Sequence, residues 1–197
     1  DAIVTDPPYE LGFMGKGWDK TGVANDVAVW AECLRVLKPG GYLLAFSGTR
    51  TYHRMVCAVE DAGFEIRDQL AWVYGSGFPK SHNGPWGGTA LKPAWEPIVM
   101  ARKPLIGTVE ENWMVHGTGA LNVEGCRVET DENLNGGAYA KVRQESTSEW
   151  ATLHKTTGAE FVQPAGRWPA NLAHDGSDEV LAAFPQAPGQ QGATGKR

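Results

Sequence analysis

An aspartate, two prolines and a tyrosine, Asp6-Pro7-Pro8-Tyr9, directly follow a short apolar run near the start of this 197-residue chain. Each proline fixes φ and lacks an N–H donor, so the backbone carbonyls of this segment are held in a stiff loop. Asp6 adds a carboxylate acceptor, and Tyr9 adds an aromatic face with a polar tip. Two rigid acceptors beside a stacking ring suit an exocyclic amino group on a planar base.

The chemistry that such a loop could support is methylation of that amino group. The amino nitrogen of adenine is a poor nucleophile because its lone pair is delocalised into the ring. Two acceptors on its N–H groups favour a pyramidal, electron-rich nitrogen, and this stabilisation grows as charge develops. Methyl transfer would then proceed in line from a sulfonium donor. The alternative is that Asp-Pro-Pro is a plain strand-ending turn.

The first hundred residues alternate strand and helix signals, which favours the chemical interpretation of the motif. Apolar runs predict strands over residues 2–5, 42–46, 64–74 and 97–101, and every second residue from 64 to 74 is expected on one face. Helical spacing predicts helices over 27–37 and 51–62, the first capped by Asn25 or Asp26. This order is typical of an α/β fold whose sheet has parallel members.

Two polar turns follow the first two predicted strands. In parallel sheets, the loops after the carboxyl ends of the strands form the ligand crevice. Asp6-Pro7-Pro8-Tyr9 follows the first strand, and Ser47-Gly48-Thr49-Arg50 follows the second. We therefore expect both turns to lie at one edge of the sheet and to border a single site.

Composition excludes several classes of protein. The net charge of -5 argues against a wholly basic protein that coats nucleic acid, although a local positive groove is compatible with it. No run of about eighteen apolar residues occurs, so no membrane span is predicted. The three cysteines are far apart and the histidines lack metal-ligand spacing. We expect a reduced, cytoplasmic compartment, with no disulfide and no metal.

Several segments resemble the DNA adenine-N6 and cytosine-N4 methyltransferase family, including its phage and restriction-modification members. They are VTDPPY, VLKPGGYLLAF, DAGFEI, YGSGFPKS, ALKPAWEPIVMARKP and GRWPAN. The resemblance implies a Rossmann-like methyltransferase sheet, represented here by its catalytic half, with a loop-rich recognition region appended. The expected division is a catalytic half-domain over residues 1–104, a target-recognition region over 105–173 and a tail over 174–197.

The same resemblance implies roles for the motif. The Asp6 carboxylate and the Pro7 carbonyl would accept from the target amino group, Pro8 would stiffen the loop, and Tyr9 would stack on a flipped-out base. The implied partners are double-stranded DNA and S-adenosylmethionine, and a homodimer is possible. The aspartate favours adenine-N6 over cytosine-N4. An amino group on RNA, or nucleic-acid binding without catalysis, are the alternatives.

One departure from the family pattern concerns the cofactor. An FxGxG-type turn after a strand is absent, because the glycines over residues 12–17 do not follow a second strand. In the motif order that begins with DPPY, that segment comes after the recognition region. We therefore expect a fragment that binds S-adenosylmethionine weakly or not at all. Its candidate cofactor contacts are Asp6, Ser47 and Thr49.

Candidate DNA contacts lie on two glycine-rich loops and near the second turn. Residues 12–18 could form a lid or a plain surface loop, and the glycines over 75–88 permit close backbone approach to DNA. Cationic side chains could meet phosphates, although a solvated charge is the alternative for each. Glu96 is expected to hold loop N–H groups. The candidate DNA contacts are Lys16, Trp18, Arg50, Lys80, Ser81 and Lys92.

Overall fold

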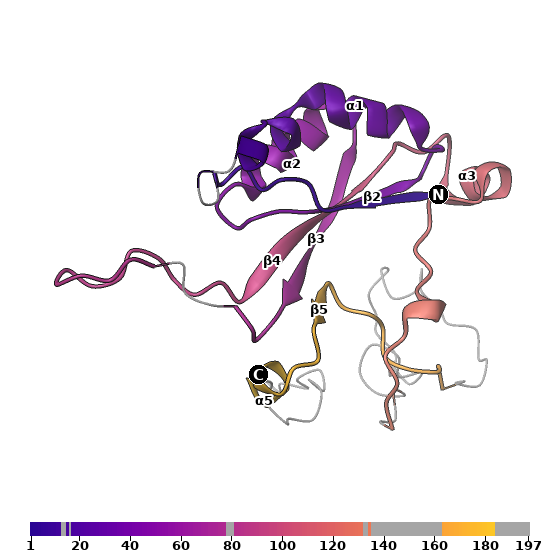
Figure 1. Ribbon diagram of the computed structural model, residues 1–197. Coiled ribbons are helices and arrows are strands. Elements are labelled where there is room, and N and C mark those ends of the chain that lie inside the picture. Colours follow the sequence, from indigo (N-terminus) through magenta and orange to yellow (C-terminus); the bar gives the residue numbers. More distant parts are fainter. Residues whose placement is uncertain (13–14, 16, 78–80, 132–133, 135–162, 184–197) are drawn as a thin grey trace, which may run out of the picture. The chain divides into compact units, whose positions relative to one another are not determined.

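The computed structural model describes residues 1–12, 15, 17–77, 81–131, 134 and 163–183. The chain divides into two compact units. One comprises Asp1–Leu121 with Ala170–Phe184, and the other comprises Asn122–Pro169 with Pro185–Arg197. The first unit contains the sheet and both turns that the sequence singled out (Figure 1).

A five-stranded sheet with the order β1-β2-β4-β3-β5 forms the centre of the first unit. β1 pairs with β2, and β3 with β5, in parallel, whereas β4 runs antiparallel to both β2 and β3. The reversal follows from the β3–β4 connection, which contains no crossover helix in its described part. The predicted α/β fold is confirmed. The strands are β1 (Ala2–Thr5), β2 (Tyr42–Phe46), β3 (Glu65–Val73), β4 (Trp95–Arg102) and β5 (Leu172–His174).

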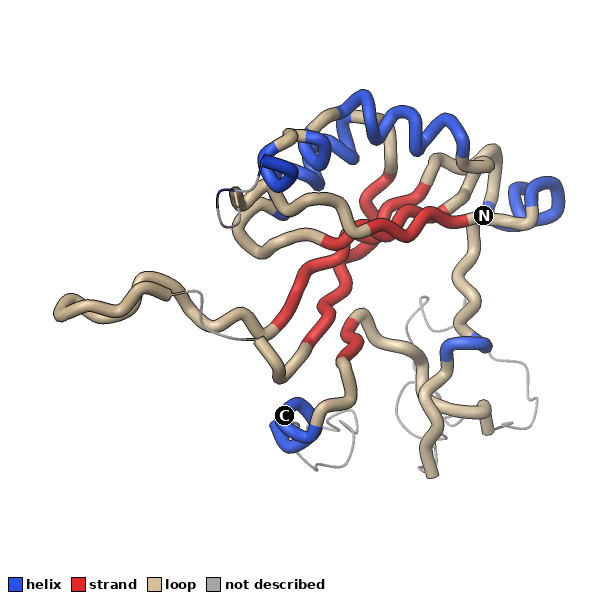
Figure 2. The backbone as a smooth tube through the Cα atoms, viewed as in Figure 1, coloured by secondary structure: helices blue, strands red, loops and turns tan. Residues whose placement is uncertain are grey.

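Two helices cover one face of this sheet, α1 (Val27–Val36) and α2 (Tyr52–Asp61) (Figure 2). Asp26 caps α1, because its carboxylate accepts the N–H of Ala28 at 2.9 Å. Both predicted helices are confirmed. The core beneath them stabilises the unit by about 1.5–3 kcal/mol for each large apolar side chain that it buries. Its fully buried side chains include Trp30, Leu43, Met55, Val59 and Val99.

A β-bulge interrupts β3, and the expectation that alternate residues over 64–74 share one face is wrong. The register with β4 shifts between Ile66 and Asp68. Ile66 pairs with Ala101 and packs against the helix-covered core, whereas Trp72 pairs with Glu96 on the opposite face. One extra residue in a strand reverses the side-chain alternation beyond it. The bulge thus places Trp72 on the same face of the sheet as Glu96.

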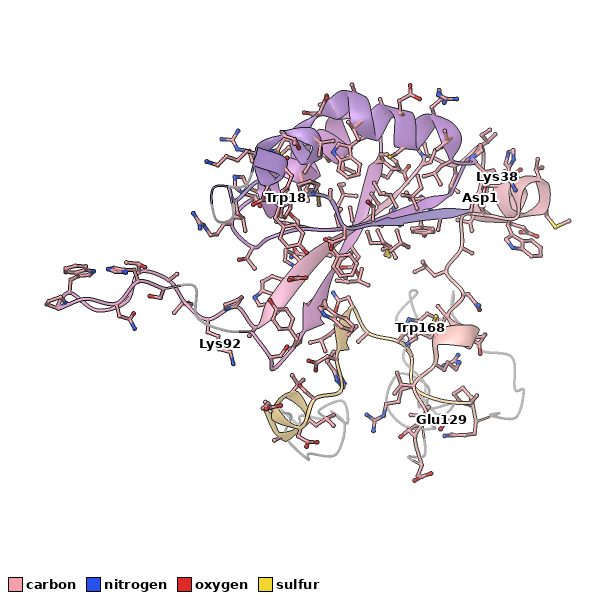
Figure 3. All side chains as sticks on the ribbon, viewed as in Figure 1. Asp1, Trp18, Lys38, Lys92, Glu129 and Trp168 are labelled. Carbon is pink, nitrogen blue, oxygen red and sulfur yellow. The ribbon has the colours of Figure 1, made fainter. Side chains whose placement is uncertain are left out.

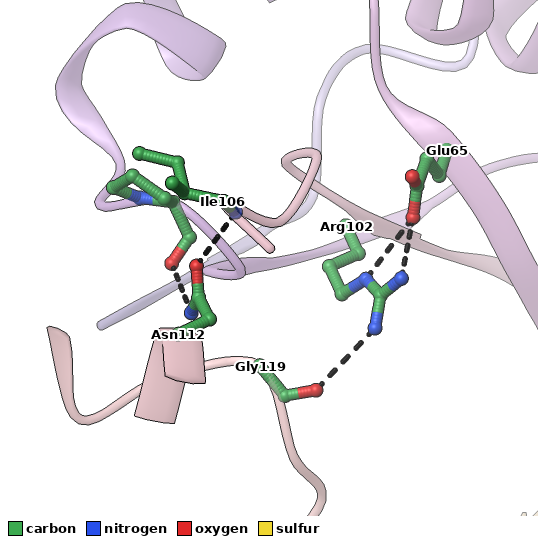
Figure 4. A network of polar contacts seen from close by, with 6 residues as sticks. Glu65, Arg102, Ile106, Asn112 and Gly119 are labelled. Carbon is green, nitrogen blue, oxygen red and sulfur yellow. Dashed lines mark hydrogen bonds and ion pairs between the residues drawn. The ribbon is translucent and has the colours of Figure 1, made fainter. Parts of the chain in front are cut away.

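A buried asparagine fixes the segment after the sheet. Asn112 lies on α3 (Val109–His116) and is 1% exposed. Its side chain accepts the N–H of Ile106 at 3.0 Å (Figure 4). It also donates to the carbonyls of Pro39 at 3.0 Å and Thr118 at 2.9 Å. Because every polar atom of this amide is used, α3 is tied to the loop that precedes β2.

An ion pair joins the same segment to the sheet. Arg102 is buried and donates to the Glu65 carboxylate at 2.6 Å and to the Gly119 carbonyl at 3.4 Å (Figure 4). Residues 105–121 therefore pack with the sheet, and the two compact units divide after Leu121, not after residue 104. A role of 105–173 in target recognition stays a prediction.

Residues 174–197, expected to form a tail, contribute regular structure in their described part. β5 pairs with the edge of β3, and α5 (Asp178–Ala183) follows it. Asn171 donates to the Gln69 carbonyl at 3.2 Å and helps to hold β5 in register. An edge strand presents unpaired N–H and C=O groups, which here recruit a strand from a distant part of the chain.

The second unit has little regular structure in its described part, which includes the short 3-10 helix η4 (Glu124–Cys126). Arg127 bonds the Glu124 carboxylate at 2.7 Å, and its guanidinium lies 5.5 Å from the ring centroid of Trp168. Trp168, labelled in Figure 3, is 59% exposed. A cation–π contact of this kind supports local packing of the tryptophan.

Replacing Asn112 with alanine should lower the free energy of unfolding by about 2–4 kcal/mol, because buried partners would lose their hydrogen bonds. Chemical denaturation of the purified chain measures the change. Asn25→Ala is the matched control, since Asn25 is exposed, and it should change stability by less than about 0.5 kcal/mol. Equal effects of the two substitutions would show that the Asn112 network does not hold α3.

Candidate active site at the carboxyl ends of the strands

The two polar turns meet at one edge of the sheet, as expected. β1 and β2 pair in parallel with Thr5 opposite Ala45, so the residues that follow each strand emerge side by side. Asp6 is exposed there, whereas Ser47 is 3% exposed and donates its N–H to the Pro97 carbonyl at 3.0 Å. Asp6 is therefore accessible to solvent at this edge, whereas Ser47 is buried and extends the hydrogen bonding between β2 and β4 by one residue.

The backbone of Tyr9 is held by the turn after β2. The hydroxyl of Thr51 donates to the Tyr9 carbonyl at 2.6 Å. A Cβ atom added to Gly48 would lie 3.3 Å from Cδ2 of Tyr9, tighter than an ordinary contact, so the glycine gives the ring its room. The sequence pointed to this turn but not to Thr51, which looked like the first residue of a helix.

The hydroxyl of Tyr9 reaches a glutamate from the far side of the sequence. It donates to Oε2 of Glu96 at 3.0 Å, and the hydroxyl of Tyr74 donates to Oε1 of the same carboxylate at 3.5 Å. Our expectation that Glu96 holds loop N–H groups is wrong in this respect, because its oxygens accept from two phenols. The antiparallel pairing of β4 brings Glu96 to the edge where the motif lies.

The local electrostatics keep both phenols protonated. Burial raises the pKa of Tyr9 far above its usual 10.0, and the negative charges of Glu96 and Asp6 raise it further. Burial also raises the pKa of Tyr74, with a second contribution from the charge of Glu96. Both hydroxyls are therefore hydrogen-bond donors at neutral pH, and the Tyr9 ring is anchored at its polar tip as well as at its backbone.

A buried aspartate anchors the loop that follows the motif. Asp19 is 2% exposed, and its carboxylate accepts the N–H of Glu10 at 3.0 Å. Glu10 adopts a left-handed φ of 58°, a conformation that costs a non-glycine residue about 1–2 kcal/mol. Two short 3-10 helices, η2 (Gly17–Lys20) and η3 (Val23–Asn25), lie in what looked like a plain loop. No sequence signal distinguishes Asp19 from a solvated loop residue.

The structure brings few of the predicted DNA contacts to this edge. Arg50 is exposed on the turn after β2, and Trp18 is 59% exposed on the loop after the motif (Figure 3). Lys16 and Lys80 lie outside the described residues. Arg50 and Trp18 therefore remain candidates by position alone.

Two further candidates have internal partners. The hydroxyl of Ser81 accepts the N–H of Thr89 at 2.8 Å, and the ammonium of Lys92 donates to the Gly75 carbonyl at 2.9 Å (Figure 3 shows Lys92). Ser81 is better explained as a structural residue of its loop, because a hydroxyl that already satisfies backbone N–H groups has less capacity for DNA. Lys92 is exposed, and its bond to Gly75 uses one of the three donor hydrogens that an ammonium carries.

The described residues contain no cluster of three side chains that could hold a metal ion. Within the same part of the chain, no helix is long and apolar enough to cross a membrane. All three cysteines are free.

Alkaline pH should reveal the Tyr9–Glu96 contact. The folded state holds Tyr9 protonated, so its contribution is complete below the unfolded pKa of 10.0 and is lost as the pH rises toward the raised folded value. Tyr9→Phe should cost about 1.5 kcal/mol of unfolding free energy at neutral pH. The deficit should shrink above pH 10. Denaturation curves across this range measure it, and a deficit that is constant with pH would contradict the contact.

These features define an α/β protein with an acceptor-lined site at the carboxyl ends of its strands. The sequence model of the N6_N4_Mtase family, described as DNA methylase, matches residues 1–116. That match spans more than half of the chain and includes the whole of β1 to β4, with the motif, the second turn and Glu96. The chain therefore belongs to this family of DNA methylases.

Individual relatives match a comparable part of the chain. The type II methyltransferase M.HindIII of Haemophilus influenzae is 31% identical over 116 residues, which cover 49% of this chain and 38% of that protein. The crystal structure of the M1.HpyAVI–SAM complex is 22% identical with a TM-score of 0.38, over 55% of this chain and 45% of that one. TTHA0409 of Thermus thermophilus, described as a putative DNA modification methylase, is 22% identical with a TM-score of 0.39, over 57% and 49%.

Proposed function

We propose that this chain forms the target-base side of a DNA methyltransferase that methylates the N6 amino group of adenine. The substrate is a base flipped out of double-stranded DNA, and the methyl donor is S-adenosylmethionine. The observation that carries the proposal is the exposed Asp6 carboxylate beside a tyrosine that is anchored at its backbone and its hydroxyl. The aspartate at the first position of the motif supports adenine.

Each part of the motif has a defined task in this proposal. The Asp6 carboxylate and the Pro7 carbonyl accept the two N–H groups of the target amino group. Tyr9 stacks on the base, and its fixed ring limits the orientations in which the base can bind. As the amino nitrogen attacks, it gains positive charge, which the Asp6 carboxylate stabilises more strongly than it does the uncharged substrate.

The methyl donor would bind at the same edge of the sheet. S-adenosylmethionine supplies an electrophilic methyl group on a sulfonium centre, and a cationic ligand fits an exposed carboxylate. Asp6 meets that requirement and Thr49 offers an exposed hydroxyl, so both stay candidate contacts. Ser47 is 3% exposed, and its burial does not support the predicted contact. We also propose a cytoplasmic location, in which the three thiols stay reduced.

The product of the reaction tests the proposal. The chain spans 38% of the length of M.HindIII, so the assay uses both this chain and the full-length product of its coding sequence. Each is incubated with S-adenosylmethionine carrying a labelled methyl group and with unmethylated duplex DNA, which is then digested to nucleosides. We expect the label in N6-methyldeoxyadenosine. A parallel sample contains RNA in place of the DNA. Label in N4-methyldeoxycytidine, label in the RNA sample alone, or no labelled product with the full-length protein would contradict the proposal.

A further inference from the structure

An arm of about twenty residues connects β3 to β4 and extends away from the sheet (Figure 1). The two halves of the arm are joined at its root, where the N–H of Tyr74 donates to the Ala94 carbonyl at 3.0 Å and Lys92 donates to the Gly75 carbonyl at 2.9 Å. The root lies at the site, because the hydroxyl of Tyr74 shares the carboxylate of Glu96 with Tyr9. The arm therefore begins next to the candidate active site.

The end of the arm is a closed, internally bonded turn. The Ser81 hydroxyl accepts the N–H of Thr89 at 2.8 Å, and the Thr89 hydroxyl accepts the N–H of His82 at 3.0 Å. Further out, Gly84 and Gly87 exchange backbone hydrogen bonds of 3.2 and 2.9 Å. A turn with this many internal bonds presents the side chains at its tip in a defined geometry.

A tryptophan is displayed at that tip. Trp86 is 71% exposed, and its ring lies over Gly84, where an added Cβ atom would come within 2.6 Å of ring carbons. The His82 ring is 6.3 Å away, centroid to centroid. Because most of this ring lies in water, its burial contributes little to the fold, and the ring is accessible to a partner.

The charge of the arm identifies its partner. No aspartate or glutamate occurs between Asp68 and Glu96, although the chain has 23 acidic residues and a net charge of -5. His82 and Lys92 are exposed on the same arm. The arm itself carries no carboxylate, although Glu179 of α5 lies against Gly75 at its root. Its exposed lysine and exposed aromatic ring suit the polyanionic duplex that a DNA methylase must hold.

We propose that Trp86 inserts into double-stranded DNA close to the target base, as an aromatic wedge that helps to hold the distorted duplex. This inference rests on the proposed function, because the duplex is the one whose base the site receives. Ten residues span at most roughly 33 Å, so the tip lies no further than about one helical turn of DNA from that base. Apolar wedges between base steps commonly accompany DNA distortion.

The binding test uses fluorescence anisotropy with a labelled duplex at one fixed salt concentration. Trp86→Ala should weaken binding of this chain by about 5- to 150-fold, the range expected for loss of one stacking contact. Trp86→Phe should retain most of the affinity. The salt dependence should not change, because no charge is removed. Trp113→Ala is the matched control, since Trp113 is 54% exposed on α3, and it should bind as the unchanged chain does.

A second measurement locates the wedge. Duplexes with 2-aminopurine at successive positions around the methylated adenine should show enhanced fluorescence at one step with the unchanged chain and none with Trp86→Ala. Equal affinities of the unchanged chain, Trp86→Ala and Trp113→Ala for the duplex would overturn the inference. Enhanced 2-aminopurine fluorescence that persists with Trp86→Ala would also overturn it. If the full-length protein transfers the methyl group but Trp86→Ala binds the duplex normally, the wedge is rejected and the proposed function stands. Trp86-dependent duplex binding without methyl transfer by the full-length protein would support the wedge and reject the proposed function.

Discussion

Replacing Asp6 with alanine should lower kcat of methyl transfer by about 100- to 1,000-fold, the usual cost of removing one group that stabilises developing charge. The affinity for duplex DNA should fall by less than the rate, by about 5- to 150-fold, because the carboxylate engages one amino group of the bound base. Single-turnover transfer of a labelled methyl group to DNA by the full-length product measures the chemical step. Anisotropy on the same proteins measures binding.

A further variant separates the charge of Asp6 from its shape. Asp6→Asn keeps an acceptor oxygen but removes the negative charge, so its rate should fall between those of the unchanged protein and Asp6→Ala. Asp26→Ala is the matched control, because Asp26 caps α1 at a distance in sequence from the motif. It should lower stability by about 1 kcal/mol and leave kcat unchanged. A wild-type rate for Asp6→Ala would show that another group accepts from the base.

The second large effect is expected at Glu96. Its carboxylate accepts from the hydroxyls of Tyr9 and Tyr74, and alanine would leave both without that partner. Because Glu96 acts through Tyr9, it is a positioning residue, and its loss should lower kcat by about 10- to 100-fold through misplacement of the ring. Glu96→Gln retains an acceptor oxygen and should restore most of the rate.

A double-mutant cycle tests whether Glu96 acts through the Tyr9 hydroxyl. In a Tyr9→Phe background that hydroxyl is already absent, so Glu96→Ala should lower kcat by much less than it does in the unchanged protein. Denaturation curves show how much of any loss comes from stability. Independent, multiplicative losses in the cycle would contradict the positioning role. They would instead assign Glu96 to the fold or to a separate contact.

The parts of the structure that depend on local pattern could be predicted from the sequence. The helical spacing from Val27 and the cap at Asp26 identified α1, and the apolar run over 42–46 identified β2. The motif and the turn after β2 were placed together because parallel strands end at one edge. Each of these inferences uses residues that are close in sequence and whose preference agrees with the fold.

The parts that depend on distant partners could not be predicted in the same way. Glu96 is 87 positions from Tyr9, and only the antiparallel pairing of β4 brings them together. Asn112 looked like part of a polar recognition region, but it is buried because three backbone partners surround its amide. Ser81 looked like a DNA contact, but its hydroxyl is used inside the arm. A polar side chain alone does not reveal whether its partner is solvent, ligand or backbone.

The central claim is that Asp6 accepts from the amino group of the target base. Binding of the unchanged full-length protein and of Asp6→Ala should be compared on duplexes with either adenine or purine, which lacks the amino group, at the methylated position. The two proteins and the two duplexes form a double-mutant cycle. A purine base leaves the duplex more easily than adenine does, but this difference in free energy is the same for both proteins and cancels in the cycle. We predict a coupling of about 1–3 kcal/mol between the carboxylate and the amino group. Equal discrimination between the two bases by both proteins would contradict the claim.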